Sequence, residues 1–264
     1  MSKIAVIGYG AVARYLAQAA ADVGIDIAGV ITRPGRGDSA RAVFGSVPVF
    51  DTVAALPMDV ELVVDCAGHP GLRAHGAAAL QTGRDVITVA TGALADDALM
   101  RDLTAAALAG HSRLRLASGA IGALDALSAA AVGRLHSVNY TGRKPPAGWA
   151  GSPAEAQLDL ANLTEPAVHF DGSARACALA YPKNANVAAS VALAGLGLDL
   201  TQAQLIADPG VTSNIHEVTA VGDFGEFRFT IAGKGLPDNP KSSALTAMSV
   251  VASVLRREAP VVLA

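Results

Sequence analysis

The sequence is poor in the residues that build disulfide frameworks, metal centres and nucleic-acid interfaces. Its 264 residues include only two cysteines, Cys66 and Cys177, in no paired motif, so both are interpreted as small buried residues. Aromatic residues make up 4% of the chain, and 20 basic against 23 acidic side chains leave a net charge of −3 without a basic cluster. Nucleic acid is therefore not an expected partner.

Long hydrophobic runs are also missing. Charged residues interrupt every apolar span before it reaches the length of a bilayer-crossing helix, and no signal-peptide pattern opens the chain. We therefore expect a cytoplasmic protein without a membrane partner.

Small and aliphatic residues are abundant instead. A hydrophobic content of 52% over 264 residues predicts a substantial core, in one large domain or two ordinary ones.

The first residues of the chain carry a dinucleotide-binding pattern. An apolar run of strand length, 3–7, is followed by Gly8, Gly10 and Ala13. Gly8 permits a sharp turn, Gly10 lets the backbone approach a pyrophosphate, and Ala13 lets the next helix pack closely on the strand. The phosphates would meet the free N–H groups where that helix begins. This pattern predicts a Rossmann domain, although a glycine turn without a ligand is the alternative.

The residues after the second predicted strand bear on the choice of cofactor. An NAD-specific site has an acidic residue there, whereas this chain has Arg33 and Arg36 within the segment 32–36. An arginine can bind the 2′-phosphate of NADP, but it can equally be a solvated loop residue. The expected cofactor is therefore NAD or NADP.

The rest of the first half alternates strands and helices, as a parallel sheet requires. We predict strands over 25–31, 47–50, 62–66, 85–88 and 113–116, and helices over 11–23, 71–82 and 96–108. Residues 1–117 are predicted to form the dinucleotide-binding domain.

The second half has the pattern of an α+β domain with an antiparallel or mixed sheet. We predict strands over 137–141 and 204–207, helices over 173–181 and 185–196, and an antiparallel hairpin of 215–221 with 226–231. A break is expected at 143–146, and Trp149 is assigned to a surface loop. This second domain spans 118–242, and the last helix, from 243 to about 257, is expected to pack back on the first domain.

Polar residues gather at element boundaries in the second half. Asn214 and His216 enter a strand of alternating pattern and so share one face, where His216 could transfer protons near neutral pH with Asn214 assisting. Asn184 or Asn186 could instead be a helix N-cap, and so could Ser242 or Ser243.

Several segments together resemble the L-aspartate dehydrogenase family. They are the amino-terminal turn, 118–125, Thr141-Gly142-Arg143-Lys144-Pro145-Pro146, Pro182-Lys183-Asn184-Ala185-Asn186-Val187, Asn214-Ile215-His216 and Asn239-Pro240-Lys241-Ser242-Ser243. The resemblance covers essentially the whole chain. Ala123 departs from it, because the family commonly has a glycine there.

The resemblance implies a homodimeric enzyme with a Rossmann domain, and it makes 118–242 the α+β catalytic and dimerisation domain. It implies NAD(P)-dependent, reversible oxidative deamination of L-aspartate to iminoaspartate, then oxaloacetate and ammonia, with a link to NAD biosynthesis. It places the catalytic histidine at His216. The candidate cofactor-binding residues are Gly8, Gly10, Ala11, Val12, Arg33, Ala120 and Asn186. A dicarboxylate substrate needs cationic or amide partners, for which the candidates are Lys241, Ser242, Ser243 and Asn214.

Two alternatives remain open. One is another two-domain NAD(P)-dependent reductase, resembling dihydrodipicolinate reductase or homoserine dehydrogenase. The other is a dinucleotide-binding sensor without catalysis, against which the presence of His216, Lys241 and the asparagines argues.

Overall fold

The computed structural model describes residues 3–237 and 239–262. The chain forms two compact units, one of Met1–Gly119 with Thr246–Ala264 and one of Ala120–Leu245.

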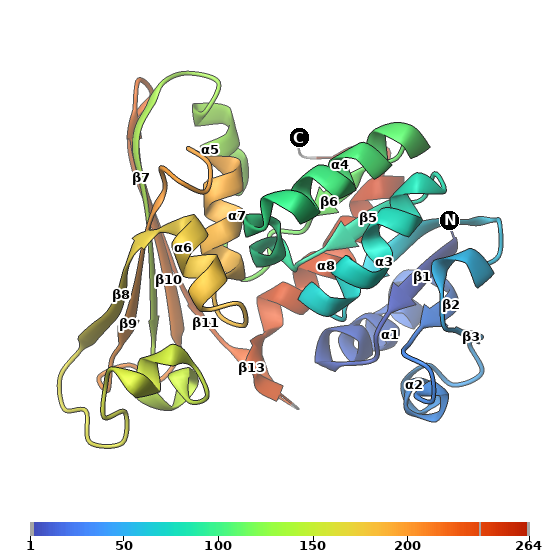
Figure 1. Ribbon diagram of the computed structural model, residues 1–264, viewed down its shortest axis with the longest axis horizontal. Coiled ribbons are helices and arrows are strands. Elements are labelled where there is room, and N and C mark those ends of the chain that lie inside the picture. The colour runs from blue at the N-terminus through green and yellow to red at the C-terminus, as the bar shows by residue number, and fades with distance from the viewer. Residues whose placement is uncertain (1–2, 238, 263–264) are drawn as a thin grey trace. The chain divides into compact units, whose positions relative to one another are not determined.

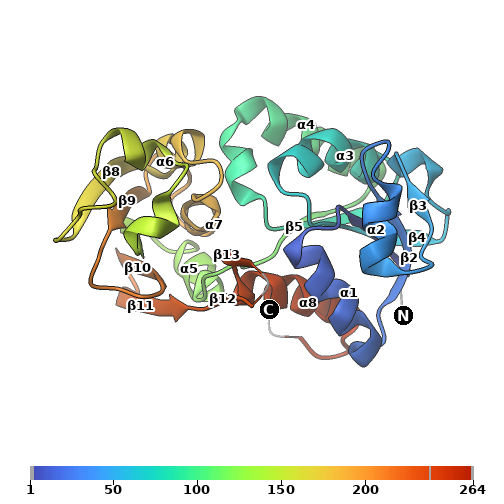
Figure 2. The same cartoon turned by 90° about the horizontal axis from the view of Figure 1, so that it is seen from below.

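The first unit contains a six-stranded parallel sheet in the order β3-β2-β1-β4-β5-β6. Its strands are β1 (Lys3–Ile7), β2 (Asp26–Ile31), β3 (Val49–Phe50), β4 (Val60–Asp65), β5 (Asp85–Thr88) and β6 (Leu114–Leu116). Its helices are α1 (Ala11–Val23), α2 (Gly37–Phe44), α3 (His69–Gln81), α4 (Asp97–Gly110), most of α8 (Ala244–Glu258), and the short 3₁₀ helices η1 (Val53–Ala55) and η2 (Thr91–Ala95). Helices α3 and α4 cover one face of the sheet and α1 and α8 the other (Figure 2).

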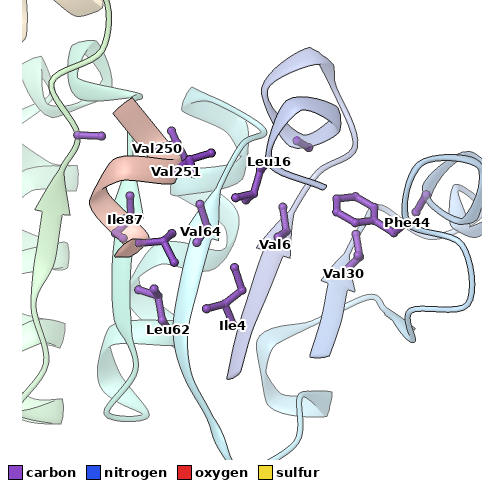
Figure 3. Close-up of a cluster of buried hydrophobic side chains, with 14 residues drawn as sticks. Ile4, Val6, Leu16, Val30, Phe44, Leu62, Val64, Ile87, Val250 and Val251 are labelled. Atoms are coloured by element: carbon purple, nitrogen blue, oxygen red, sulfur yellow. The ribbon is translucent and has the colours of Figure 1, made fainter. Parts of the chain in front are cut away.

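The core on the α1 and α8 side explains why the strands are almost continuously apolar. Ile4, Val6 and Leu62 belong to one buried cluster with Leu16 of α1 and Val250 of α8 (Figure 3). A strand that helices cover on both faces has no solvent-facing side, so it lacks the alternation of an exposed sheet. The carboxyl-terminal helix therefore completes a core that begins with the first strand of the chain.

The second unit contains a five-stranded mixed sheet in the order β11-β10-β7-β9-β8. Its strands are β7 (Leu135–Lys144), β8 (Ala167–Ser173), β9 (Gln202–Ala207), β10 (Asn214–Gly222) and β11 (Gly225–Gly233), and β12 (Gly235–Leu236) pairs separately with β13 (Asn239–Ser243). Strands β7 and β9 are parallel, and the other neighbours in the five-stranded sheet are antiparallel. The helices α5 (Leu124–Ala130), α6 (Ala174–Ala180) and α7 (Asn186–Ala194) lie on one face of this sheet (Figure 1), and η3 (Pro146–Trp149) and η4 (Pro153–Ala156) follow β7.

The fold class predicted from the sequence is confirmed: a Rossmann-type α/β unit is joined to a unit with a mixed sheet. Some local predictions were wrong. Strand β7 does not break at residue 143 but continues through Lys144, and Trp149 is fully buried rather than on the surface. The indole Nε1 of Trp149 donates to the carbonyl of Ile206 at 3.0 Å, which satisfies its polar atom inside the core.

Candidate functional site

The first unit places the glycine turn between β1 and α1, at the point where the strand order reverses. Gly8 has φ +90°, and a Cβ there would lie 2.9 Å from the Cβ of Ala67, so both its conformation and its space favour glycine. A Cβ at Gly10 would meet nothing within 4 Å. Gly10 is also the N-cap of α1 and has no side chain to cap it, so the first N–H groups of the helix, at Ala11 and Val12, have no intrahelical acceptor. The geometry fits a pyrophosphate.

A buried carboxylate supports this turn from the neighbouring strand. Asp65, at the end of β4, is fully buried and accepts hydrogen bonds from the Ala67 backbone N–H at 3.0 Å and from the Thr88 hydroxyl at 2.8 Å. Burial raises the pKa of this carboxyl to about 6, although its hydrogen bonds act in the opposite direction. Asp65 thus fixes the loop that packs against Gly8.

The segment after β2 carries no acidic residue. Arg33 and Arg36 are both exposed, between the end of β2 and the start of α2. The buried Thr32 donates its hydroxyl proton to the Arg33 carbonyl at 3.2 Å. Both guanidinium groups are therefore free of burial and available to an anionic ligand.

The second unit holds His216 in a defined pair with a tyrosine. His216 lies on β10, is 4% exposed, and has its Nδ1 2.8 Å from the hydroxyl of Tyr140 on β7. The two rings are stacked, with centroids 6.0 Å apart and planes 21° apart. Burial, followed by the charge of Lys144, lowers the pKa of His216 to about 4. The imidazole is therefore neutral at physiological pH.

The pair depends on a glycine. Gly142 of β7 stands opposite His216 in the antiparallel register, and a Cβ there would lie 2.6 Å from the Tyr140 hydroxyl. No real side chain tolerates that distance, so any residue with a Cβ would displace the hydroxyl from His216. The missing side chain leaves the space in which the tyrosine and histidine meet.

Lys144 is the second unusual group on this face of the sheet. The residue is 9% exposed. Its ammonium donates to the Asn184 Oδ1 at 2.9 Å and lies 4.5 Å from the centre of the Trp149 ring. Burial lowers the pKa of Lys144 to about 8. The side-chain oxygen of Asn184 is thus bound to a cation. The N-cap of α7 is Ala185, which makes no side-chain capping bond, so neither Asn184 nor Asn186 is the N-cap of this helix.

A cavity of about 800 Å³ opens beside these groups, within the second unit. Lys144, Lys183 and Lys234 line it together with Asn184 and Asn214, and none of the described lining residues is acidic. The cavity is therefore positively charged and suited to a small anion.

The remaining predicted residues lie in several places. Ala120 is buried just before α5, and Asn186 is the first residue of α7. Ser242 accepts a hydrogen bond from the Asn239 side chain at 3.1 Å, and the Ser243 hydroxyl is buried without a partner among the described residues. The side chain of Lys241 lies outside the described part of the structure.

Sequence reasoning missed Tyr140, Lys144 and Asp65 as site residues. Alternation along β7 places Tyr140, Gly142 and Lys144 on one face. This alternation is the sequence signal that could have identified the first and last of them. The predicted break at 143–146 hides it, because it removes Lys144 from the strand. Asp65 ends an apolar strand, where a carboxylate is unusual.

Two absences hold for residues 3–237 and 239–262. No group of three or more histidine, cysteine, aspartate or glutamate side chains is arranged to hold a metal ion. No helix in these ranges has both the length and the apolar character needed to cross a bilayer.

Two family models match the chain. The model described as aspartate dehydrogenase, C-terminal, matches residues 125–257, and the model described as homoserine dehydrogenase, NAD binding domain, matches residues 6–117. Each match falls mainly in one of the two units.

Relatives match over almost the full length. The chain is 58% identical to the L-aspartate dehydrogenase of Ruegeria pomeroyi over 259 residues, which cover 98% of this chain and 94% of that protein. It is 48% identical to the L-aspartate dehydrogenase of a Polaromonas species, with 97% and 98% covered.

Solved structures share the fold. The crystal structure of aspartate dehydrogenase from Thermotoga maritima superposes with a TM-score of 0.76 at 24% identity, and all of both chains is covered. A hyperthermophilic archaeal homoserine dehydrogenase in complex with NADPH gives a TM-score of 0.60 at 11% identity, with 98% of each chain covered. These likenesses support the two-unit architecture alone.

Proposed function

The chain belongs to the L-aspartate dehydrogenase family, and on that premise we propose that it catalyses the NAD(P)-dependent oxidative deamination of L-aspartate. The substrate would lose a hydride from Cα and a proton from nitrogen to give iminoaspartate, which water converts to oxaloacetate and ammonia. The reverse reaction uses the same groups. The observation that carries the proposal is a cavity lined by three lysines, one of which, Lys144, lies two residues along β7 from the position opposite the buried His216. A dicarboxylate needs cations, and its amine needs a proton acceptor.

The cofactor would be held by the glycine turn of the first unit. A nicotinamide dinucleotide, when bound, accepts the hydride. The backbone at Gly8, Gly10, Ala11 and Val12 would bind the pyrophosphate, and the exposed Arg33 would bind a 2′-phosphate. By resemblance to the family, Ala120 and Asn186 are further candidates for cofactor contact.

His216 would perform the proton transfer. Because its imidazole is neutral at pH 7, it has a lone pair that can take a proton from the substrate ammonium or from the water that hydrolyses the imine. Tyr140 fixes the ring from one side. Asn214, on the same face of β10, lines the cavity and would assist in holding the substrate. Lys241, Ser242 and Ser243 remain candidates for substrate binding.

Assembly and context follow from the resemblance. We expect a homodimer in the cytoplasm whose iminoaspartate serves pyridine nucleotide biosynthesis. Light scattering of the purified protein measures the oligomeric state, and a mass of one protomer would contradict the expectation.

Initial rates test the proposed function directly. Wild-type enzyme should form NADH or NADPH from L-aspartate, and should consume it with oxaloacetate plus ammonia. His216→Ala should lower kcat by roughly 10²-fold or more, the usual contribution of a general acid or base. His136→Ala is the matched control, since His136 is exposed on β7, and it should leave kcat unchanged.

Two results would overturn the proposal. Turnover of homoserine or dihydrodipicolinate in place of aspartate would identify another reductase, and binding of cofactor without turnover of any of these substrates would identify a sensor. Near-normal turnover by His216→Ala would remove the histidine from the mechanism.

A further inference from the structure

The cavity of the second unit has an uncompensated positive charge. Three ammonium groups line it, from Lys144, Lys183 and Lys234, and no carboxylate does so among the described residues. Lys183 and Lys234 are exposed, so water screens them. The buried ammonium of Lys144 therefore dominates the recognition of a ligand.

The buried ammonium of Lys144 has uncharged partners, which is unusual for a buried cation. Its partners are an amide oxygen of Asn184 and the face of Trp149. No described carboxylate forms an ion pair with it, whereas the adjacent Arg143 is paired with Asp208 at 2.6 Å. A buried charge is costly unless an opposite charge compensates it, and its lowered pKa reflects that cost. A bound anion would supply the compensation.

The strand register places Lys144 two residues beyond Gly142, which lies opposite the proposed proton acceptor. Gly142 pairs with His216 and Arg143 with Ile215, so Lys144 follows on β7 at the level where Asn214 begins β10. Lys144, Asn214 and His216 lie on the same face of the sheet because residues two apart along a strand share a face. An anion held at Lys144 is thus within the reach of a small substrate from His216.

We infer that Lys144 binds a carboxylate group of the substrate and, with Asn184 and Trp149 holding its ammonium in place, determines the affinity of the enzyme for L-aspartate. This inference rests on the proposed function for the identity of the substrate. It assigns a specificity role to a residue of β7 rather than to the Lys241 segment.

Steady-state kinetics of Lys144→Met tests the assignment. Methionine keeps the length of the side chain and removes the charge, so the KM for L-aspartate should rise by about 30-fold or more, the effect of losing a charge-assisted hydrogen bond. The kcat and the KM for the cofactor should stay within about threefold. The thermal midpoint should not fall, because a buried charge has been removed. Lys144→Gln serves the same comparison if the methionine variant does not fold.

Succinate provides a probe that does not depend on turnover. Its affinity, measured by calorimetry on the full chain in the presence of NAD⁺ or NADP⁺, should weaken by a similar factor in Lys144→Met. Lys3→Met is the control for loss of a lysine charge, because Lys3 is exposed and pairs with Asp59 in the first unit. That variant should bind succinate like the wild type.

The outcomes separate the two claims. If the wild-type enzyme does not oxidise L-aspartate but Lys144→Met still binds succinate more weakly than the wild type, the proposed function fails and the anion site stands. If the wild type oxidises L-aspartate and Lys144→Met keeps both its KM and its succinate affinity, this inference is overturned alone. A lower kcat at an unchanged KM would also overturn it.

Discussion

At the scale of single residues, the protonation of His216 is set by its neighbours. Burial removes water from the ring, and the nearby Lys144 cation further disfavours a second positive charge. The pKa of Tyr140 is raised by burial far above physiological pH, so its hydroxyl keeps its proton. Both side chains of the pair are therefore uncharged, and the hydroxyl orients the imidazole through a hydrogen bond between neutral groups.

Removing the Tyr140 hydroxyl should impair turnover without impairing binding. Tyr140→Phe leaves the buried Nδ1 of His216 without its 2.8 Å partner, and the loss of one hydrogen bond, about 1 kcal/mol, corresponds to a roughly five- to tenfold lower kcat. Gly142→Ala should have a similar effect, because its Cβ would displace the same hydroxyl. Steady-state kinetics over pH 5–9 measures both, and the KM for L-aspartate should stay within about twofold.

Tyr181→Phe is the matched control for this comparison. Tyr181 is also buried, and its hydroxyl lies 3.0 Å from the Nδ1 of His169, so the same atom is lost from a second tyrosine and histidine pair. Its variant should lose stability with kcat unchanged. If Tyr140→Phe and Tyr181→Phe behave alike, the Tyr140 hydroxyl is structural and does not position His216.

At the scale of elements, β4 ends in a buried carboxyl, Asp65, that lowers the stability of the fold and also holds the Ala67 backbone in place. Asp65 has a folded pKa of about 6 against an ordinary value of 3.8, so the folded state binds its proton more tightly than the unfolded state. Below pH 3.8 the carboxyl is protonated in both states and has no cost. As pH rises through 3.8 to 6 the cost appears, and above pH 6 it amounts to about 3 kcal/mol of lost stability.

Asp65→Asn should therefore stabilise the protein at pH 8 by roughly 1–3 kcal/mol and flatten the pH dependence between pH 4 and 6. It should also weaken cofactor binding, because the Ala67 loop beside Gly8 loses a charged acceptor. Urea unfolding at several pH values and titration with NADPH measure the two effects. The exposed Asp22→Asn should change stability by less than about 0.5 kcal/mol, and an unchanged pH slope in Asp65→Asn would contradict the assignment.

Elements with local signals could be predicted from the sequence, and elements defined by distant partners could not. The β1 and α1 pattern and the β10 and β11 hairpin are encoded by adjacent residues, and both form as expected. The end of β7 depends on pairing with β9 and β10, so two charged residues before prolines gave the pattern of a break. Trp149 is buried through contacts with β9, some 57 residues away.

The same limit applies to the candidate site. Strand alternation predicts that His216 and Asn214 share one face, and both lie on β10. Tyr140 and Lys144 could not be associated with them, because the antiparallel register of β7 against β10 brings together residues more than seventy positions apart. The conformation of Ala123 could not be predicted from its residue type either. Its φ of +60° is in the region that favours glycine, the residue expected there from the family.

At the scale of the whole molecule, the first unit is assembled from both ends of the chain. Val250, Val251 and Val254 of α8 join the buried cluster that contains β1 and β4. The second unit is continuous in sequence and contains Trp149, the chain's single tryptophan. Because each unit has its own core, we expect the two to respond separately to a change in only one of them.

Val250→Asp should unfold the first unit selectively. The substitution buries an unpaired carboxylate among apolar side chains, which should destabilise that unit by roughly 4 kcal/mol or more. Met248→Asp places the same charge on the same helix at a position that is 46% exposed, and should be nearly neutral. In urea, circular dichroism of Val250→Asp should show an early transition and cofactor binding should be lost, while Trp149 fluorescence should keep its wild-type midpoint. A common shift of both signals would show that the units unfold as one cooperative structure, because the damage at α8 would then have reached a tryptophan that belongs to the other core.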